Sequence, residues 1–314
     1  MRLPAQKTSV IQKKITGNYP ISKGFRYKIL WSGCVRCWVK VAKYNSMCYT
    51  CIMGRILMIF DTHTHYSDKR FDNDRHNLLL SMEQNGIGNI VEVGAGIKST
   101  KEAVKLSGEY SFIYAAVGIH PSEAAGTTEE DIEWIKSLAL KEKVVAVGEI
   151  GLDYHYDEPS RQVQKKWFVR QLEIAREMGL PVIIHSRDAA EDTLNIMKTF
   201  YKSNTGEGYG VIHCFSYSAE IAKIYIDMGF YLGIGGVVTF KNSKKLIDVV
   251  SKVPLDRIVL ETDAPYLTPE PHRSERNSSL NLKYVVEKIA EIKGSTQKEV
   301  IDITEKNARR LYRL

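Results

Sequence analysis

Residues 144–149 read VVAVGE, residues 162–178 read QVQKKWFVRQLEIAREM, and residues 181–185 read PVIIH. The two short runs are rich in β-branched residues, which is typical of buried strands. The segment between them repeats apolar residues at intervals of three and four and is followed by Gly179, which predicts a helix that ends there. A strand, a helix and a second strand in this order form a unit whose strands pair in parallel through a right-handed crossover.

The same alternation continues on both sides of this unit. The other six expected strands are residues 58–61, 89–93, 112–117, 210–213, 230–233 and 257–261. Eight strand–helix units within residues 58–314 match the ~250 residues of a closed (β/α)8, or TIM, barrel, which is an α/β fold. Two further helices, expected near 282–293 and 297–311, close the chain. An open doubly wound sheet is the alternative, but no glycine-rich phosphate-binding sequence follows the first strand.

The charge of the chain is distributed unevenly. The sequence has 44 Lys and Arg against 37 Asp and Glu, but eleven of the basic residues and none of the acidic ones lie in residues 1–57. Residues 58–314 therefore carry 33 basic and 37 acidic residues, a net charge of −4. Nucleic-acid binding cannot be argued from such a charge, and would need a local patch or bound metal. Apolar runs of only strand length and the single cysteine of the barrel, Cys214, predict a cytoplasmic protein without membrane association.

Residues 1–57 differ in composition from the rest and allow three interpretations. They contain two Cys-x-x-Cys pairs at knuckle-like spacing, which would suit zinc: Cys34, Cys37, Cys48 and Cys51. A basic targeting peptide is the second interpretation, although the many cysteines and aromatic residues argue against it. The third is that this basic extension is not a domain: it is disordered, or translation starts at Met58, directly before the first expected strand. We expect the third, because the segment lacks paired periodic elements.

Polar residues follow five of the expected strands, at the carboxyl ends where barrels place their active sites. His63 and His65 follow the first strand, and their side chains point to the same side of an extended chain. The other strand ends contribute Glu149, His185, His213 and Asp263. Nitrogen and oxygen donors without a thiolate suit zinc, manganese or magnesium. The sequence therefore predicts a divalent-metal centre.

The number of ligands predicts two ions. Six donors exceed the three protein ligands usual for one catalytic ion, whereas two ions bridged by a carboxylate would use them all. We expect Glu149 to bridge the ions, with His63, His65 and Asp263 on one ion. His185 and His213 would hold the other ion. Asp263 is the expected general base for an activated water, which makes Asp263 and Glu149 the predicted catalytic residues.

Weaker predictions concern the residues around this centre. Arg187, Arg273 and His120 are candidates for binding substrate phosphate, with a surface ion pair or a loop anchor as the alternative for each. Cys214 is expected to point away from His213 on a strand and to pack in the core. Asp153 is expected to shape the pocket or to cap the loop that follows it.

Six sequence strings resemble, in order and spacing, the TatD family of metal-dependent hydrolases: DTHTH (61–65), VGEIGLDY (147–154), LPVIIHSRDA (180–189), GVIHCFS (210–216), ETDAPYLTPEPHR (261–273) and NARRLY (307–312). The resemblance covers essentially all of residues 58–314. It implies a TIM barrel of the amidohydrolase superfamily, divalent metal, and deoxyribonuclease activity that commonly acts 3′→5′ on single-stranded ends. It also implies the six ligands named above. The departures from the family pattern are Tyr66, Tyr217, Ser278 and Ser279, which we expect in loops near the mouth, where they leave the substrate range open.

We therefore predict hydrolysis of phosphodiester bonds in DNA, with nucleic-acid ends as the substrate. An ester hydrolase such as a D-aminoacyl-tRNA deacylase is one alternative, because the same site would serve it. A barrel that binds nucleic acid without catalysis is another. The complete ligand set argues against that alternative, since binding alone has no need for donors that activate water.

Overall fold

The computed structural model describes residues 38–41, 44–48, 57–202 and 208–314. The chain divides into two compact units, Met1–Ile56 and Leu57–Leu314. In the first unit, strands β1 (Trp38–Val41) and β2 (Tyr44–Cys48) pair in antiparallel fashion. The predicted zinc knuckle and the predicted disordered or untranslated extension fall largely outside the described residues, and both stay predictions.

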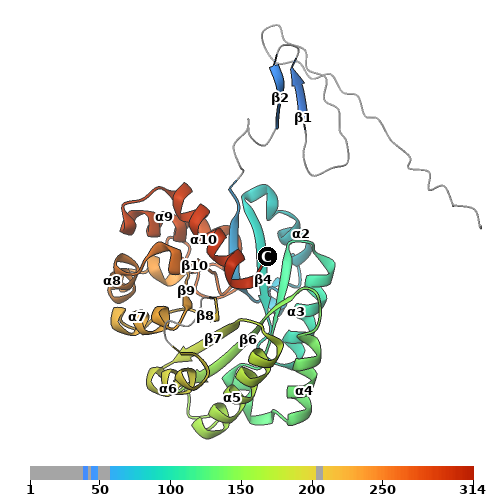
Figure 1. Ribbon diagram of the computed structural model, residues 1–314, viewed down its shortest axis with the longest axis vertical. Helices are drawn as coiled ribbons and strands as arrows, with labels where there is room; N and C mark the ends of the chain where they lie inside the picture. The colour runs from blue at the N-terminus through green and yellow to red at the C-terminus, as the bar shows by residue number, and fades with distance from the viewer. Residues whose placement is uncertain (1–37, 42–43, 49–56, 203–207) are drawn as a thin grey trace, which may run out of the picture. The chain divides into compact units, whose positions relative to one another are not determined.

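The second unit is the predicted (β/α)8 barrel (Figure 1). Its strands pair in parallel, each with its neighbour in the sequence: β3 (Ile59–Thr64), β4 (Ile87–Val93), β5 (Ile113–Val117), β6 (Val144–Asp153), β7 (Val182–Arg187), β8 (Gly210–Ile212), β9 (Phe230–Ile234) and β10 (Ile258–Leu260). The helices are α2 (Arg75–Leu80), α3 (Ile97–Glu109), α4 (Glu129–Leu138), α5 (Arg161–Met178), α6 (Ala190–Phe200), α7 (Ala219–Asp227) and α8 (Lys244–Lys252), followed by the two predicted closing helices, α9 (Leu282–Lys293) and α10 (Gln297–Tyr312).

Local chemistry explains where these helices start and stop. Helix α4 begins with a capping box, in which the side chain of Thr128 accepts from the amide of Asp131 and the Asp131 side chain accepts from the amide of Thr128. Helix α5 ends at Gly179 as predicted, with φ at 65°, a conformation that glycine adopts without steric cost.

The barrel closes between its first and last strands. Thr64 forms an isolated parallel bridge with Ala264, and the amide of His65 donates to the carbonyl of Ala264 (2.8 Å). The amide of Asp263 donates to the carbonyl of His63 (3.0 Å). These bonds lie beyond residue 61, where we expected the first strand to end. The backbone continues to pair although the side chains have become polar, so the closure itself brings His63 and His65 beside Asp263.

Two apolar clusters form the core. One takes residues from all eight strands and from no helix except α10, so it fills the inside of the barrel: Phe60, Val91, Val93, Ala116, Val145, Ala146, Ile183, Val211, Tyr231, Val259, Ala308, Leu311 and Tyr312. The larger cluster packs the outer faces of the strands against the surrounding helices. Across the described ranges, no helix has both the length and the apolar composition to cross a membrane.

Candidate metal centre

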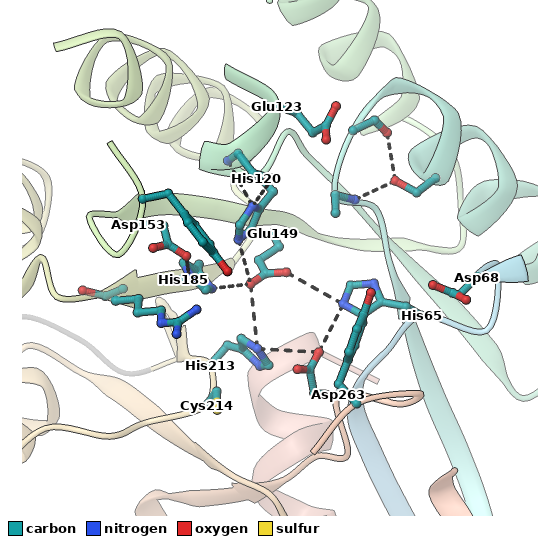
Figure 2. A pocket seen from close by; sticks show the side chains of 18 of the residues that line it. His65, Asp68, His120, Glu123, Glu149, Asp153, His185, His213, Cys214 and Asp263 are labelled. Atoms are coloured by element: carbon teal, nitrogen blue, oxygen red, sulfur yellow. Dashed lines mark hydrogen bonds and ion pairs between the residues drawn. The ribbon is translucent and has the colours of Figure 1, made fainter. Parts of the chain in front are cut away.

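The six predicted ligands come together at the carboxyl ends of the strands. Five of them line a cavity of about 980 Å³ that opens there: His65, Glu149, His185, His213 and Asp263. Figure 2 shows these five side chains pointing toward one another. The sixth, His63, is only 1% exposed, and its ring stacks on that of His213 with centroids 3.6 Å apart.

One pair of histidines faces a single point. Nε2 of His63 and Nε2 of His65 are 3.1 Å apart. Oε2 of Glu149 lies 3.5 Å from the first nitrogen and 3.8 Å from the second, and Oδ1 of Asp263 lies 3.3 Å from Nε2 of His65. Two imidazole ligands of one zinc ion, each at ~2.0–2.1 Å from the metal, are about 3 Å apart. The spacing of the donors therefore fits a common cation.

The second pair of histidines meets the other oxygen of Glu149. Nδ1 of His185 is 2.8 Å from Oε1 of Glu149, and Nε2 of His213 is 3.8 Å from the same oxygen. Nε2 of His213 also lies 3.9 Å from Oδ1 of Asp263. Each oxygen of Glu149 thus faces a different pair of histidines, which is the arrangement expected of a carboxylate between two cation positions.

The charges of the donors reinforce one another. Burial opposes ionisation of Glu149, but the nearby His120, His213 and His63 and a hydrogen bond from His185 hold its pKa well below the usual range. Burial likewise opposes ionisation of Asp263, and its hydrogen bond with His65 outweighs that effect and lowers its pKa. Both carboxylates are therefore anionic and available to a cation at neutral pH.

Three of the histidines are oriented through their second ring nitrogen. Nδ1 of His65 is 3.0 Å from the carbonyl oxygen of Val93, and Nδ1 of His213 is 3.1 Å from Oε1 of Glu261. Nε2 of His185 is 3.0 Å from Oδ2 of Asp153. Such contacts hold a metal-binding imidazole in one orientation. Asp153 also accepts from the amide of His155 (3.0 Å), so it shapes the pocket and caps the loop as well.

Three buried carboxylates that the sequence analysis missed lie around the donors: Asp61, Glu92 and Glu261. Asp61 accepts hydrogen bonds from the hydroxyls of Thr262 (2.7 Å) and Ser279 (2.6 Å). Glu92 accepts from the amides of Tyr66 and Ser67, both at 2.7 Å. Asp61 and Glu261 each directly follow an apolar run and precede a predicted ligand by two residues, and this spacing was the available signal.

Tyr66 and Ser279, two departures from the family pattern, do not lie at the mouth as expected. Tyr66 is fully buried, and its hydroxyl accepts from the amide of Ser279 (2.8 Å). The hydroxyl of Ser279 in turn donates to Asp61, so these two residues support the strand that carries His63. The hydroxyl of a third departure, Tyr217, lies 2.9 Å from the hydroxyl of Ser186.

The three predicted phosphate-binding residues lie in different environments. Arg187 and His120 line the cavity, whereas Arg273 is not among its lining residues. The guanidinium of Arg273 lies 3.6 Å from the centre of the Phe240 ring and donates to the carbonyl of Thr268 (2.8 Å). For Arg273, this placement favours the loop-anchor alternative.

His120 presents a proton to the cavity. The amide of Ser122 donates to Nδ1 of His120 (3.1 Å), and because an amide N–H can only donate, the ring proton sits on Nε2. Burial lowers the pKa of His120 to about 4, which keeps the ring neutral. Nε2 lies 3.8 Å from Oε1 of Glu149, at the edge of the donor cluster. His120 is therefore better suited to donate a hydrogen bond than to bind a cation.

The expected core position of Cys214 is wrong. Strand β8 ends at Ile212, and Cys214 has a φ of 44°, so the alternation of a strand no longer applies to it. Its side chain lines the cavity instead of packing in the core. Burial raises the pKa of the thiol well above its usual value, so the thiol remains protonated and is a poor nucleophile.

The cavity is rich in carboxylates. Its lining includes seven of them and only three lysines or arginines. An excess of carboxylates over lysines and arginines fits a site that holds cations.

Comparison with known proteins gives a consistent result. The family model described as TatD related DNase matches residues 60–313. A Bacillus subtilis protein described as uncharacterized metal-dependent hydrolase YabD is 46% identical over 257 residues, which cover 82% of this chain and 100% of the relative. A Rahnella protein described as 3′-5′ ssDNA/RNA exonuclease TatD is 31% identical, covering 82% of this chain and 98% of the relative.

A solved structure supports the same relationship. The TatD homologue YjjV from Escherichia coli K12 superimposes with a TM-score of 0.77 at 29% sequence identity. The match covers 82% of this chain and 99% of the homologue. The similarity thus extends over the whole barrel.

Proposed function

This chain belongs to the TatD family of metal-dependent hydrolases, and from that premise we propose that it cleaves phosphodiester bonds in single-stranded nucleic acid, removing nucleotides from the 3′ end with the help of two divalent cations. A relative that is 31% identical is described as a 3′-5′ ssDNA/RNA exonuclease. The observation that carries the proposal is the position of Glu149, whose two oxygens face separate pairs of histidines.

The donor geometry suggests how the ions would be shared. His63, His65 and Asp263 would hold one ion, His185 and His213 the other, and Glu149 would contribute one oxygen to each. When bound, two divalent cations would lower the pKa of a water molecule toward neutrality and offset charge on the phosphoryl oxygens. Magnesium, manganese and zinc all accept this set of nitrogen and oxygen donors.

Asp263 is the proposed general base. It lines the cavity, and its side chain is 18% exposed against 5% for Glu149, so it is the carboxylate of the pair that an incoming water can reach. Its lowered pKa keeps it ionised and able to accept a proton from that water. Asp263 also has a φ of 57°, a strained conformation for a residue with a side chain, and such strain is often found at active sites.

His120 and Arg187 are the proposed phosphate-binding residues. The Nε2 proton of His120 points into the cavity and can donate to a phosphoryl oxygen. Arg187 is the last residue of strand β7, which also carries His185, and it lines the same cavity. A neutral donor and a cation on this side would orient the phosphodiester so that water attacks from the side of Asp263.

The test is a panel of substrates offered to the full-length protein with magnesium, manganese or zinc. We expect a single-stranded DNA labelled at its 5′ end to give a ladder that shortens from the 3′ end, and chelation with EDTA to stop it. The alternative activity, release of a D-amino acid from D-aminoacyl-tRNA, is an arm of the same panel. Cleavage of the aminoacyl ester with no cleavage of any phosphodiester would overturn the proposal.

A further inference from the structure

Exposed aromatic rings are concentrated at the mouth of the cavity. Within the described ranges, six large hydrophobic side chains stay exposed, and Ile97, Tyr156 and Tyr266 among them line the cavity. Tyr156 is 63% exposed and Tyr266 is 48% exposed. Exposed apolar surface gathered at one opening indicates a binding surface.

The two tyrosines lie on opposite sides of this mouth. Tyr156 follows strand β6 and Tyr266 follows strand β10. In the ring of eight strands, three strands separate β6 from β10 on one side, and three separate them on the other. Loops that follow strands four places apart in a closed barrel of eight face each other across its axis. Both tyrosines line the same cavity as the donors around Glu149.

Each ring has an arginine on one face. The guanidinium of Arg70 lies 4.1 Å from the centre of the Tyr266 ring, and that of Arg187 lies 5.9 Å from the centre of the Tyr156 ring. One face of each ring thus has a cationic partner. Because both rings are also exposed, each has surface left for stacking with a second group. The backbone of Tyr266 is also held in place, because its amide donates to the backbone carbonyl of Asp263 (2.8 Å) and its carbonyl accepts from the side-chain amide of Asn277 (2.8 Å).

We propose that Tyr156 and Tyr266 are specificity-determining residues that stack on the two nucleobases flanking the scissile phosphodiester. This inference rests on the proposed function and adds to it the reason for a single-stranded substrate. Both rings line the cavity that contains the metal donors, so bases on either side of a phosphodiester bound there can stack on them. A base in a duplex is already stacked and paired, whereas an unpaired base has a free face for an aromatic side chain.

The experiment compares three substrates with the full-length, metal-loaded protein. The first is a fully abasic oligodeoxyribose phosphate, which has phosphodiester bonds but no aromatic ring. The second is a short single-stranded oligonucleotide. The third set consists of the same oligonucleotide with an abasic residue on the 5′ or the 3′ side of the scissile bond. The variants are Tyr156→Ala, Tyr266→Ala and the two conservative replacements by Phe. Leu140→Ala is the control, because Leu140 is 74% exposed and does not line the cavity.

We expect each alanine variant to lower kcat/KM on the oligonucleotide by roughly tenfold, mostly through KM, because stacking contributes to binding both the substrate and the transition state. The Phe variants should retain wild-type values, since phenylalanine keeps the ring. No variant should change hydrolysis of the fully abasic strand. On a strand that is abasic on one side, the wild type should lose a similar factor, and one of the two alanine variants should lose nothing further.

Two results would overturn the inference, and they are distinguishable. If the wild type cleaves base-bearing and abasic strands equally well and the alanine variants do the same, stacking is wrong while the phosphodiesterase activity stands. If the metal-loaded wild type cleaves neither the oligonucleotide nor the fully abasic strand, the proposed function fails and the stacking inference fails with it.

Discussion

Oε1 of Glu261 lies 3.1 Å from Nδ1 of His213, and both side chains are almost completely buried. The same oxygen accepts from the amide of Cys214 (2.7 Å), which fixes the carboxylate relative to the ring. Nε2 of His213 consequently points toward Glu149 and Asp263. A carboxylate behind a metal-binding imidazole sets both its orientation and its basicity.

Glu261→Gln should therefore weaken metal binding. The amide keeps the shape of the side chain but removes the charge, and we expect the affinity for Mn²⁺ to fall by roughly 10- to 100-fold, with activity recovering at high metal concentration. Isothermal titration calorimetry measures the affinity. Glu275→Gln is the matched control, because Glu275 makes a similar contact with Nδ1 of His272 (2.8 Å) on an exposed loop. Unchanged Mn²⁺ affinity in Glu261→Gln would contradict the role.

Glu149→Ala should abolish paired metal binding. Without the side chain, the His63–His65 pair and the His185–His213 pair no longer share a ligand, so fewer than two ions should remain per chain and kcat should fall at least a hundredfold. Metal analysis of the purified protein gives the stoichiometry. Glu123→Ala, which removes another carboxylate from the cavity lining, should leave two ions in place. Two ions in Glu149→Ala would disprove the bridge.

Metal affinity should rise with pH. Burial disfavours the charged forms of His65, His185 and His213, but neighbouring carboxylates outweigh it and raise their pKa to about 9, 9 and 10 in the metal-free protein. A cation must displace these protons, so below pH 9 each displaced proton makes the apparent affinity increase by up to about tenfold per pH unit. Titration with Mn²⁺ at pH 6, 7 and 8 checks this, and an affinity that stays flat or falls would be inconsistent with it.

Nucleic-acid binding itself should depend on metal. Carboxylates outnumber lysines and arginines in the cavity lining, so divalent cations at the donor cluster would strengthen its attraction for a phosphodiester. Fluorescence anisotropy with a labelled single-stranded oligonucleotide should show at least tenfold weaker binding in EDTA than in Ca²⁺, an ion chosen to support binding with little turnover. If EDTA left the affinity unchanged, the oligonucleotide would bind elsewhere on the protein.

The barrel and the donor cluster could be predicted from local sequence, because strand–helix alternation and strand ends are encoded by neighbouring residues. The hydrogen-bond network that supports the donors could not be predicted in this way. Asp61 depends on Ser279, which is 218 residues away, and no local pattern indicates such a pairing. Tyr66 was misplaced for the same reason, because its hydroxyl is bonded by Ser279, 213 residues away. Cys214 was misplaced because its backbone leaves regular strand geometry, so the alternation of sides stops holding at the end of the strand.

Asp61 should make the stability of the barrel fall as pH rises. Burial raises the pKa of its carboxyl to about 7, against a usual 3.8, although hydrogen bonds from Ser279 and Thr262 oppose the shift. The folded protein therefore holds a proton that the unfolded chain releases above pH 4. The stabilisation from this proton is complete below about pH 4. It is lost as pH rises to about 7, which lowers the free energy of unfolding by up to roughly 4 kcal/mol for a pKa shift of this size. Urea unfolding in EDTA across this range measures the loss of stability, with Asp61→Asn as the reference.

Because the Asp61→Asn variant has no carboxyl at this position, its free energy of unfolding should fall less between pH 4 and 7 than that of the wild type. Parallel pH profiles for the two proteins would show that Asp61 is ionised in the folded state and held by its hydrogen bonds alone.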